Sequence, residues 1–198
     1  MKFSFAILAA AVMAVQASAL PAADAEKMDK PPAIQPVQAA AAQLESHPVR
    51  CPKALPVEFL RSYHAANTDH FYTTDVNEMN TAATTYGYNR EGNAGRVYTG
   101  KTRETTPLFR VYSDYWKDHF YTTNPQERDS YVWKYKYTDE GVAGHVFRSR
   151  VCGSIPLYRL YHTGVIDHFY TTNAAEVGTA QALGYYNEGI VGFGVEVE

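Results

Sequence analysis

Asp167-His168-Phe169-Tyr170-Thr171-Thr172 is the third copy of a hexapeptide that also occupies residues 69–74 and 118–123. The spacing between successive copies is 49 residues both times. An identical hexapeptide at a fixed period indicates an internal repeat, whose copies need one another to bury a core. The sequence therefore predicts three related units, at about residues 55–103, 104–152 and 153–198.

Each unit carries the signals for two strands, a helix and a further strand. Runs rich in aromatic and β-branched residues favour a first strand, and the hexapeptide continues it as a hairpin. A capping box then begins the helix in each unit, with Asp75 and Glu78, Asn124 and Glu127, or Asn173 and Glu176. Gly87 and Gly184 suit helix ends, whereas Lys136 stands at the corresponding place in the second unit, so we expect that helix to end differently.

One unit of this size is too small to bury a sufficient core alone. Three units can do so if they close around an axis or stack, and we favour closure because it removes the exposed strand edges that promote aggregation. We therefore expect a β-rich α+β fold of three ββαβ repeats closed around a pseudo-threefold axis, similar to a β-trefoil.

The N-terminal region differs in composition from the repeats. Residues 1–19 have the pattern of a secretory signal peptide, with Lys2, an apolar run and an Ala-x-Ala cleavage site. Residues 20–50 are rich in Ala, Pro and Gln and lack aromatic residues, so we expect a disordered linker or propeptide. Residues 51–198 are then a single globular domain of a secreted, extracellular protein.

Cys51 and Cys152 are the two cysteines of the chain. In a secreted protein they favour a disulfide, which would join the segment before the first unit to the end of the second. The alternative is that either cysteine pairs with another chain.

The charge and composition narrow the class of partner. The net charge is −3 and no basic run occurs, which argues against nucleic acid or an anionic membrane as a partner. The chain holds 16 Tyr, 9 Phe and 2 Trp, a density that suits a core, a sugar-stacking surface or both. The oligomeric state is left open.

The Asp-His pair of the hexapeptide admits two interpretations. Three imidazoles around one axis would match a zinc site. The structural alternative is that each Asp closes its hairpin loop and each His bonds to a neighbouring strand, and we favour it, expecting no metal and no cofactor. The residues concerned are Asp69, His70 and Tyr72; Asp118, His119 and Tyr121; and Asp167, His168 and Tyr170.

Arginine and glutamate recur with the repeat. Arg61, Arg110 and Arg159 lie in the first strands, and Glu91, Glu140 and Glu188 lie near the ends of the units. Partly buried Arg–Glu pairs would explain both sets without any function. The functional alternative is that the arginines bind an acidic ligand.

The first hairpin loops of the three units differ in sequence, as loops that set binding specificity do. Candidate ligand-binding residues are His64 and Asn67 in the first loop, Asp114, Tyr115, Trp116 and Lys117 in the second, and His162 and Thr163 in the third. We expect Tyr115 and Trp116 to form an exposed pair for stacking on a sugar, and Trp133 to lie in the core. The alternative is loop variation without function.

Three motifs together resemble a family of secreted repeat domains of fungi and bacteria that carries a domain-of-unknown-function label. They are Pro-Leu-Tyr-Arg-Leu-Tyr at 156–161, Asp-His-Phe-Tyr-Thr-Thr-Asn at 167–173, and Tyr-x-x-Glu-Gly at 185–189. The resemblance covers residues 56–198. It implies a binding or targeting role beside secreted hydrolases, and it brings no catalytic residues.

The sequence contains no G-x-S-x-G, no H-E-x-x-H and no phosphate-binding loop. We therefore expect a secreted, non-catalytic binding module that recognises carbohydrate, such as cell-wall glycan. One alternative is a secreted hydrolase acting on glycans through carboxylates outside known motifs. Another is a secreted structural or effector-type interaction protein without a small ligand.

Overall fold

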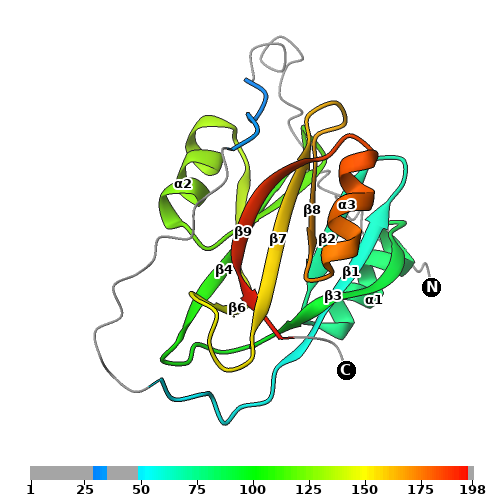
Figure 1. The fold of residues 1–198 in the computed structure, drawn as a ribbon. Helices are drawn as coiled ribbons and strands as arrows, with labels where there is room; N and C mark the ends of the chain where they lie inside the picture. Colours follow the sequence, from blue (N-terminus) through cyan, green and yellow to red (C-terminus); the bar gives the residue numbers. More distant parts are fainter. Residues whose placement is uncertain (1–28, 35–48, 196–198) are drawn as a thin grey trace, which may run out of the picture.

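The computed structural model describes residues 29–34 and 49–195 (Figure 1). Within this part of the chain each unit consists of two strands, one helix and a further strand. Unit one contains β1 (Val57–His64), β2 (Asp69–Thr73), α1 (Val76–Thr85) and β3 (Asn89–Val97). Unit two contains β4 (Thr105–Ser113), β5 (Asp118–Thr122), α2 (Pro125–Lys134) and β6 (Thr138–Phe147). Unit three contains β7 (Ile155–His162), β8 (Asp167–Thr171), α3 (Ala174–Ala182) and β9 (Tyr186–Gly194).

The three strands of a unit are antiparallel, with the first strand between the other two. Unit one forms a three-stranded sheet in the order β2-β1-β3. Units two and three share a six-stranded sheet, β5-β4-β6-β9-β7-β8, in which β6 and β9 are joined through the single pair Phe147–Phe193. Isolated bridges from Arg96 to Val195 and from Tyr98 to His145 connect unit one to the other two units. The last strands of all three units therefore contact one another.

The helices begin where the capping signals predict. The side chain of Asp75 accepts the backbone N–H groups of Asn77 and Glu78, and Asn124 does the same in unit two. These contacts satisfy N–H groups that have no partner within the first turn.

The expectation that the second helix ends differently is wrong. Lys136 has a φ of 60°, the left-handed conformation that Gly87 adopts with a φ of 79° and Gly184 with a φ of 98°. A residue with a Cβ is disfavoured there by about 1–2 kcal/mol. The backbone path after the helix is thus shared by all three units, and unit two accepts the strain.

The second strands β2, β5 and β8 are fully buried and contact one another pairwise. Tyr72, Tyr121 and Tyr170 lie on these strands and have no exposed surface. The N–H of Tyr72 donates to the Tyr121 hydroxyl, that of Tyr121 to Tyr170, and that of Tyr170 to Tyr72, each at 2.8 Å. Each tyrosine hydroxyl therefore binds the backbone of the preceding unit, and the three bonds form a closed cycle.

The core has one shared part and several separate parts. The shared cluster contains the three tyrosines with Phe59, Leu108 and Leu157, one from the first strand of each unit. Smaller clusters lie beneath each helix, for example Phe71 with Met79 under α1. The units are therefore held together by a common core as well as by hydrogen bonds.

The similarity to a β-trefoil is not confirmed. The structure is β-rich, with a three-stranded sheet, a six-stranded sheet and three helices in its described part. In each unit the chain passes through the helix and then returns to pair its last strand with its first, as β3 pairs with β1. This return places the strands of a unit side by side in one sheet.

Cys51 and Cys152 form a disulfide with a Cα–Cα distance of 5.5 Å, which confirms the prediction from the sequence. It joins the segment before β1 to the segment before β7. None of the described helices has the length and apolar character needed to span a bilayer.

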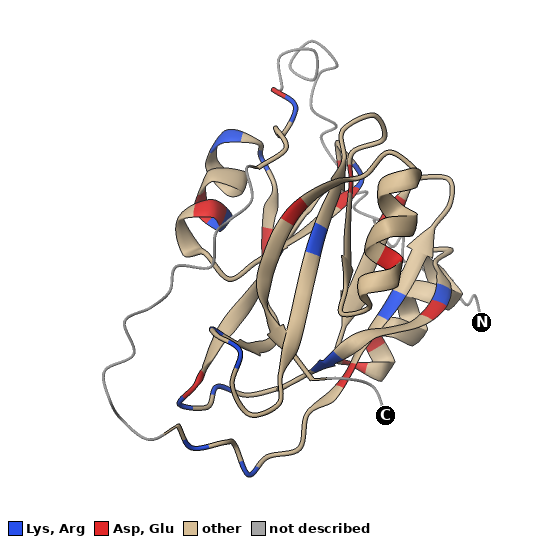
Figure 2. Cartoon of the chain, viewed as in Figure 1, with Lys and Arg blue, Asp and Glu red and all other residues tan. Residues whose placement is uncertain are grey.

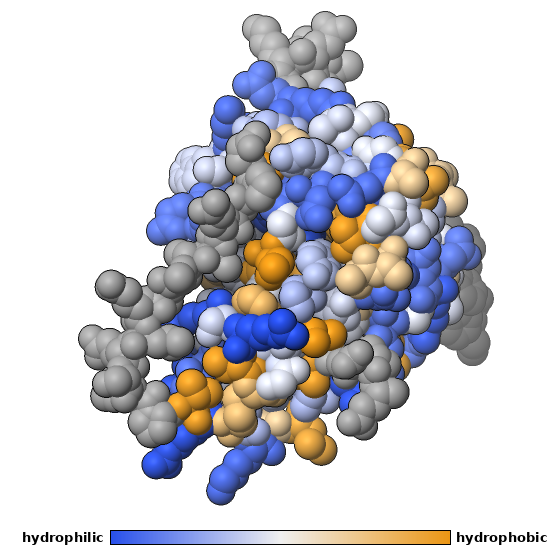
Figure 3. Space-filling view, viewed as in Figure 1, coloured by the Kyte–Doolittle hydropathy of each residue, from blue (hydrophilic) through white to orange (hydrophobic). Residues whose placement is uncertain are grey.

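The visible surface is mixed in charge and polarity. Basic and acidic residues are interspersed along the strands and helices in Figure 2. In Figure 3 the hydrophobic residues are scattered between polar ones, with several gathered toward the lower part of this face. The mixture agrees with the small net charge of −3.

The expected signal peptide, residues 1–19, lies outside the described residues. The expected linker, residues 20–50, contains the described stretch 29–34, which lies beside α2 (Figure 1). In this stretch Pro31 is buried, and the Tyr161 hydroxyl donates to its carbonyl oxygen at 3.0 Å.

Candidate ligand-binding cleft

The interfaces between units are built from one repeated set of charged residues. The guanidinium of Arg110 makes two hydrogen bonds to Glu78 of unit one, at 2.7 and 3.1 Å. Arg159 binds Glu127 of unit two in the same way, and Arg61 binds Glu176 of unit three. Each arginine thus binds the helix of the preceding unit through a bidentate ion pair, which fixes both distance and orientation.

The same arginines also contact the glutamates of their own units. The Nε atoms of Arg61, Arg110 and Arg159 lie 3.0, 2.8 and 2.7 Å from carboxylate oxygens of Glu91, Glu140 and Glu188. Each guanidinium is therefore shared between two carboxylates, so an acidic ligand would have to displace one of them.

The sequence did not predict the role of the helix glutamates. The capping-box pattern places Glu78 back over its own helix terminus, whereas its carboxylate extends to Arg110. The one available signal was the constant separation of 32 residues between Glu78 and Arg110 and between Glu127 and Arg159.

The Asp-His motif also acts between units. Asp69 accepts the backbone N–H of His119 at 2.8 Å and contacts its Nδ1 at 2.7 Å. Asp118 makes the same two contacts with His168, and Asp167 makes them with His70. Each carboxylate also accepts a tyrosine hydroxyl of its own unit, such as that of Tyr137 on Asp118 at 2.7 Å. The imidazoles are thus bonded to the adjacent unit instead of converging on an axis.

The zinc alternative predicted a cluster of three imidazoles. The cluster in the structure consists of three carboxylates instead. Asp69, Asp118 and Asp167 are buried, and their nearest oxygens lie within 4.8 Å of one another. Burial opposes a charge on Asp69, but the imidazole of His119 and its hydrogen bonds outweigh this and lower the pKa of Asp69. Burial, with the charges of the other two carboxylates, raises the pKa of Asp118. The hydrogen bonds that these carboxylates accept from histidine and tyrosine explain how they can be buried.

The interfaces differ in how much space the helix leaves. A cleft of about 480 Å³ separates units one and two, and Ala82 of α1 forms part of its wall. The corresponding residue of α2 is Tyr131, whose ring stacks on Phe120 at 3.7 Å. At that second interface Ile34 also packs against the cluster that contains Phe120 and Tyr131, and a separate hollow of about 30 Å³ lies beside Arg159 and Glu188. The open first interface thus has the small Ala82 where the filled second interface has a tyrosine.

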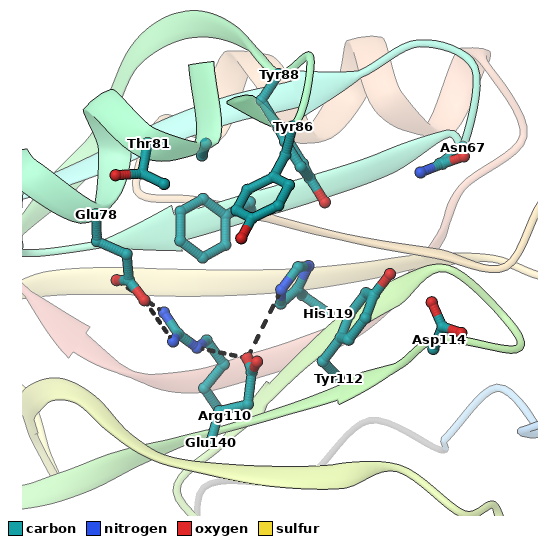
Figure 4. A pocket seen from close by; sticks show the side chains of 12 residues that line it. Asn67, Glu78, Thr81, Tyr86, Tyr88, Arg110, Tyr112, Asp114, His119 and Glu140 are labelled. Atoms are coloured by element: carbon teal, nitrogen blue, oxygen red, sulfur yellow. Dashed lines mark hydrogen bonds and ion pairs between the residues drawn. The ribbon is translucent and has the colours of Figure 1, made fainter. Parts of the chain in front are cut away.

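Aromatic rings and charged groups line the open cleft in separate regions (Figure 4). Glu78, Arg110 and Glu140 lie at one end, joined by ion pairs. The rings of Tyr86 and Tyr112 face the cleft from α1's end and from β4, respectively. Asn67 and Asp114 lie at the opposite end, on loops of different units. The cleft therefore combines ring faces with polar groups at both ends.

Two of the groups that line the cleft, Glu78 and Tyr112, have shifted pKa values. Burial opposes the charge of Glu78, but hydrogen bonds from Arg110 and Thr73 outweigh it and lower the pKa of Glu78. Burial and the charge of Asp69 raise the pKa of Tyr112 to about 12. Glu78 is therefore an acceptor and Tyr112 a donor at neutral pH.

The structure brings two of the predicted loop residues into the cleft, Asn67 and Asp114. Lys117 forms an ion pair with Asp114 at 2.5 Å. His64 and His162 accept backbone N–H groups within their own loops through Nδ1, so they hold the loops in shape. Thr163 is exposed in the third loop.

The two tryptophans lie differently from what the sequence predicts. Tyr115 is 47% exposed and its ring contacts that of Trp116 with centroids 4.7 Å apart, but Trp116 is partly buried against the cluster beneath α2. Trp133 is 77% exposed, although its helical position suggested the core. In α2 the buried position belongs to Tyr131.

Another hollow, of about 640 Å³, lies between β3 and the strands β7 and β8. Tyr158 is the one aromatic residue among those that line it. It offers fewer ring faces than the cleft between units one and two, which we therefore take as the candidate site.

The arrangement of strand, hexapeptide and helix extends over the region that a family model matches. The model described as a domain of unknown function (DUF5648) matches residues 58–195. The chain belongs to this family. Membership covers all three units and identifies the family resembled by the sequence motifs. No curated protein and no solved structure matches the chain.

Proposed function

We propose that this protein is a secreted, non-catalytic module that binds glycans, and that a sugar chain occupies the cleft between units one and two. The observation that carries the proposal is the combination of ring faces and hydrogen-bonding groups in an opening of about 480 Å³. Sites for small ligands commonly join apolar or aromatic walls with a few placed polar groups.

The chemistry of the lining supports a neutral sugar. Tyr86 is 64% exposed and presents a ring on which a pyranose can stack. Glu78 and Glu140 offer acceptors for sugar hydroxyl groups, and Tyr112 offers a donor. Arg110 pairs with both glutamates but carries a single positive charge, so the three groups together remain acidic and favour a neutral sugar over an acidic one.

The hydrolase alternative is less well supported. A glycosidase needs one carboxyl group that is protonated at working pH and a second that is ionised. Glu78 and Glu140 both bind Arg110, and the pKa of Glu78 is lowered, so Glu78 is unsuited to the role of acid.

We also infer that the three units are arranged around a pseudo-threefold axis. The cyclic contacts of the three tyrosines, the Asp–His pairs and the Arg–Glu pairs all run from one unit to the unit before it, which supports this arrangement. The disulfide supports an oxidising, extracellular environment.

The test is an array of cell-wall oligosaccharides, followed by calorimetric titration of the bound ones. We expect binding that Tyr86→Ala weakens by at least about tenfold, equal to about 1.4 kcal/mol. Trp133→Ala is the matched control, since Trp133 is also an exposed aromatic residue on a helix surface but does not line the cleft.

Loss of binding in Trp133→Ala with full binding in Tyr86→Ala would overturn the assignment to this cleft. An array without any bound glycan would favour the interaction-protein alternative. Release of reducing sugar from wall polysaccharide by the wild-type chain would favour the hydrolase.

A further inference from the structure

The second interface, between units two and three, already holds a peptide. Residues 31–34, Pro-Pro-Ala-Ile, lie against it although they are more than 100 positions from Glu188 and Tyr161 in the chain. Pro31 is buried, and Ile34 packs against the apolar cluster that contains Phe120 and Tyr131. We propose that this interface is a binding site for an extended, proline-containing peptide, and that residues 31–34 are its tethered ligand.

Two hydrogen bonds to the peptide backbone define the direction of the ligand. The Tyr161 hydroxyl donates to the carbonyl oxygen of Pro31 at 3.0 Å. The N–H of Ile34 donates to a carboxylate oxygen of Glu188. A proline-rich strand leaves its carbonyl groups free for such donors, because it has no internal hydrogen bonds. The donor and the acceptor thus bind the four-residue segment at its first and its last residue.

The apolar contacts favour proline and an aliphatic residue. Tyr131, Tyr135 and Tyr137 belong to the buried cluster against which Ile34 packs, and Trp116 packs against the same cluster. Grooves lined by aromatic residues are a recurring recognition site for proline-rich segments, whose restricted backbone loses little entropy on binding.

The charges at this interface are preformed for the peptide. Glu188 is 1% exposed and its other oxygen lies 2.7 Å from Nε of Arg159, which holds the carboxylate in place. Tyr161 is fixed by its ring, which stacks on His168 at 4.2 Å. Both groups that bind the peptide backbone are thus positioned by contacts within the repeats.

The other interfaces lack this aromatic wall. Where unit two has Tyr131 and Tyr135, unit one has Ala82 and the exposed Tyr86, and unit three has Ala180. The peptide site is therefore distinct from the proposed glycan cleft, and either proposal can fail without the other.

The test uses the full chain with Ile34→Asp, which places a charge against the apolar cluster and releases the segment. Trp133→Phe in the same chain leaves Trp116 as its one tryptophan. We expect the emission of Trp116 to shift to longer wavelength on Ile34→Asp. A fluorescent peptide with the sequence Asp-Lys-Pro-Pro-Ala-Ile should then bind saturably and reverse the shift.

The controls separate this site from others. The wild-type chain should bind the peptide at least about tenfold more weakly, because its own segment competes at an effective concentration of about millimolar. Tyr161→Phe should weaken binding about fivefold, as expected for one lost hydrogen bond. Tyr112→Phe, at the corresponding position of unit two, should leave it unchanged.

Absence of both the emission shift and saturable binding in the Ile34→Asp chain would overturn the proposal. Equal weakening by Tyr112→Phe and Tyr161→Phe would also overturn it, since the peptide would then occupy a different interface.

Discussion

At the scale of single residues, Tyr72, Tyr121 and Tyr170 link the three units, because each hydroxyl forms a hydrogen bond with the backbone of another unit. Tyr121 both accepts the N–H of Tyr72 and donates to its carbonyl oxygen, each at 2.8 Å. In a dry core, a backbone group that loses its partner costs more than the bond itself contributed.

We therefore expect Tyr121→Phe to lower the free energy of unfolding by about 1–3 kcal/mol, although the ring and its packing remain. Tyr186→Phe is the control, because Tyr186 is 43% exposed and should change stability by less than about 0.5 kcal/mol. Chemical denaturation followed by circular dichroism measures both. Equal losses in the two variants would contradict the role of the buried hydroxyl.

Residue-level contacts were the part that the sequence predicted least. Alternation along a strand correctly argues against a bond between Asp69 and His70 of the same hexapeptide. The actual partner of Asp69 is His119, which is 50 residues away in the chain. No local rule specifies which unit follows which in space, so this pairing required the structure.

At the scale of elements, the helices explain why similar units present different interfaces. Asp75 and Asn124 begin their helices as predicted, because capping depends only on neighbouring residues. The burial of α2 was predicted less well: Trp133 is exposed and Tyr131 is buried. Both are aromatic residues of one helix, and the face of the helix that packs against the strands determines which of the two is buried.

We expect Ala82→Tyr to close the cleft between units one and two. Its ring would lie on Phe71 as that of Tyr131 lies on Phe120, where the rings are 3.7 Å apart and nearly parallel. Glycan binding should be lost in titration calorimetry, while the melting temperature is kept or raised.

The reverse change, Tyr131→Ala, should cost about 3–5 kcal/mol, as large-to-small changes of buried aromatic residues do. Thermal unfolding of both variants checks the pair. A chain with Ala82→Tyr that binds glycan as well as the wild type would contradict the assignment of the cleft.

At the scale of the whole molecule, the disulfide encloses units one and two. Cys51 and Cys152 are separated by 101 positions, so the bond restricts a long segment of the unfolded chain. The pairing could be predicted from the sequence, because two cysteines in a chain expected to be secreted leave few choices. The close contact of residues 31–34 with unit two could not be predicted from the sequence, since the composition of this segment resembles that of a linker.

We expect the double substitution Cys51→Ser with Cys152→Ser to lower the free energy of unfolding by up to about 4–5 kcal/mol, the chain-entropy value for a loop of this length. The guanidinium midpoint of the variant, compared with that of the oxidised wild type, measures the loss. Coincident midpoints would show that the crosslink adds nothing to the shared core.

The direction of the tyrosine bonds has a consequence for the order of the chain. Every bond runs from one unit to its predecessor, and unit one in turn binds unit three through Tyr72 and the N–H of Tyr170. This cycle of bonds has no first or last unit, so it does not depend on which unit comes first in the chain. A circular permutant opened between units two and three would keep every one of these bonds, whereas deleting a unit would orphan partners on both sides.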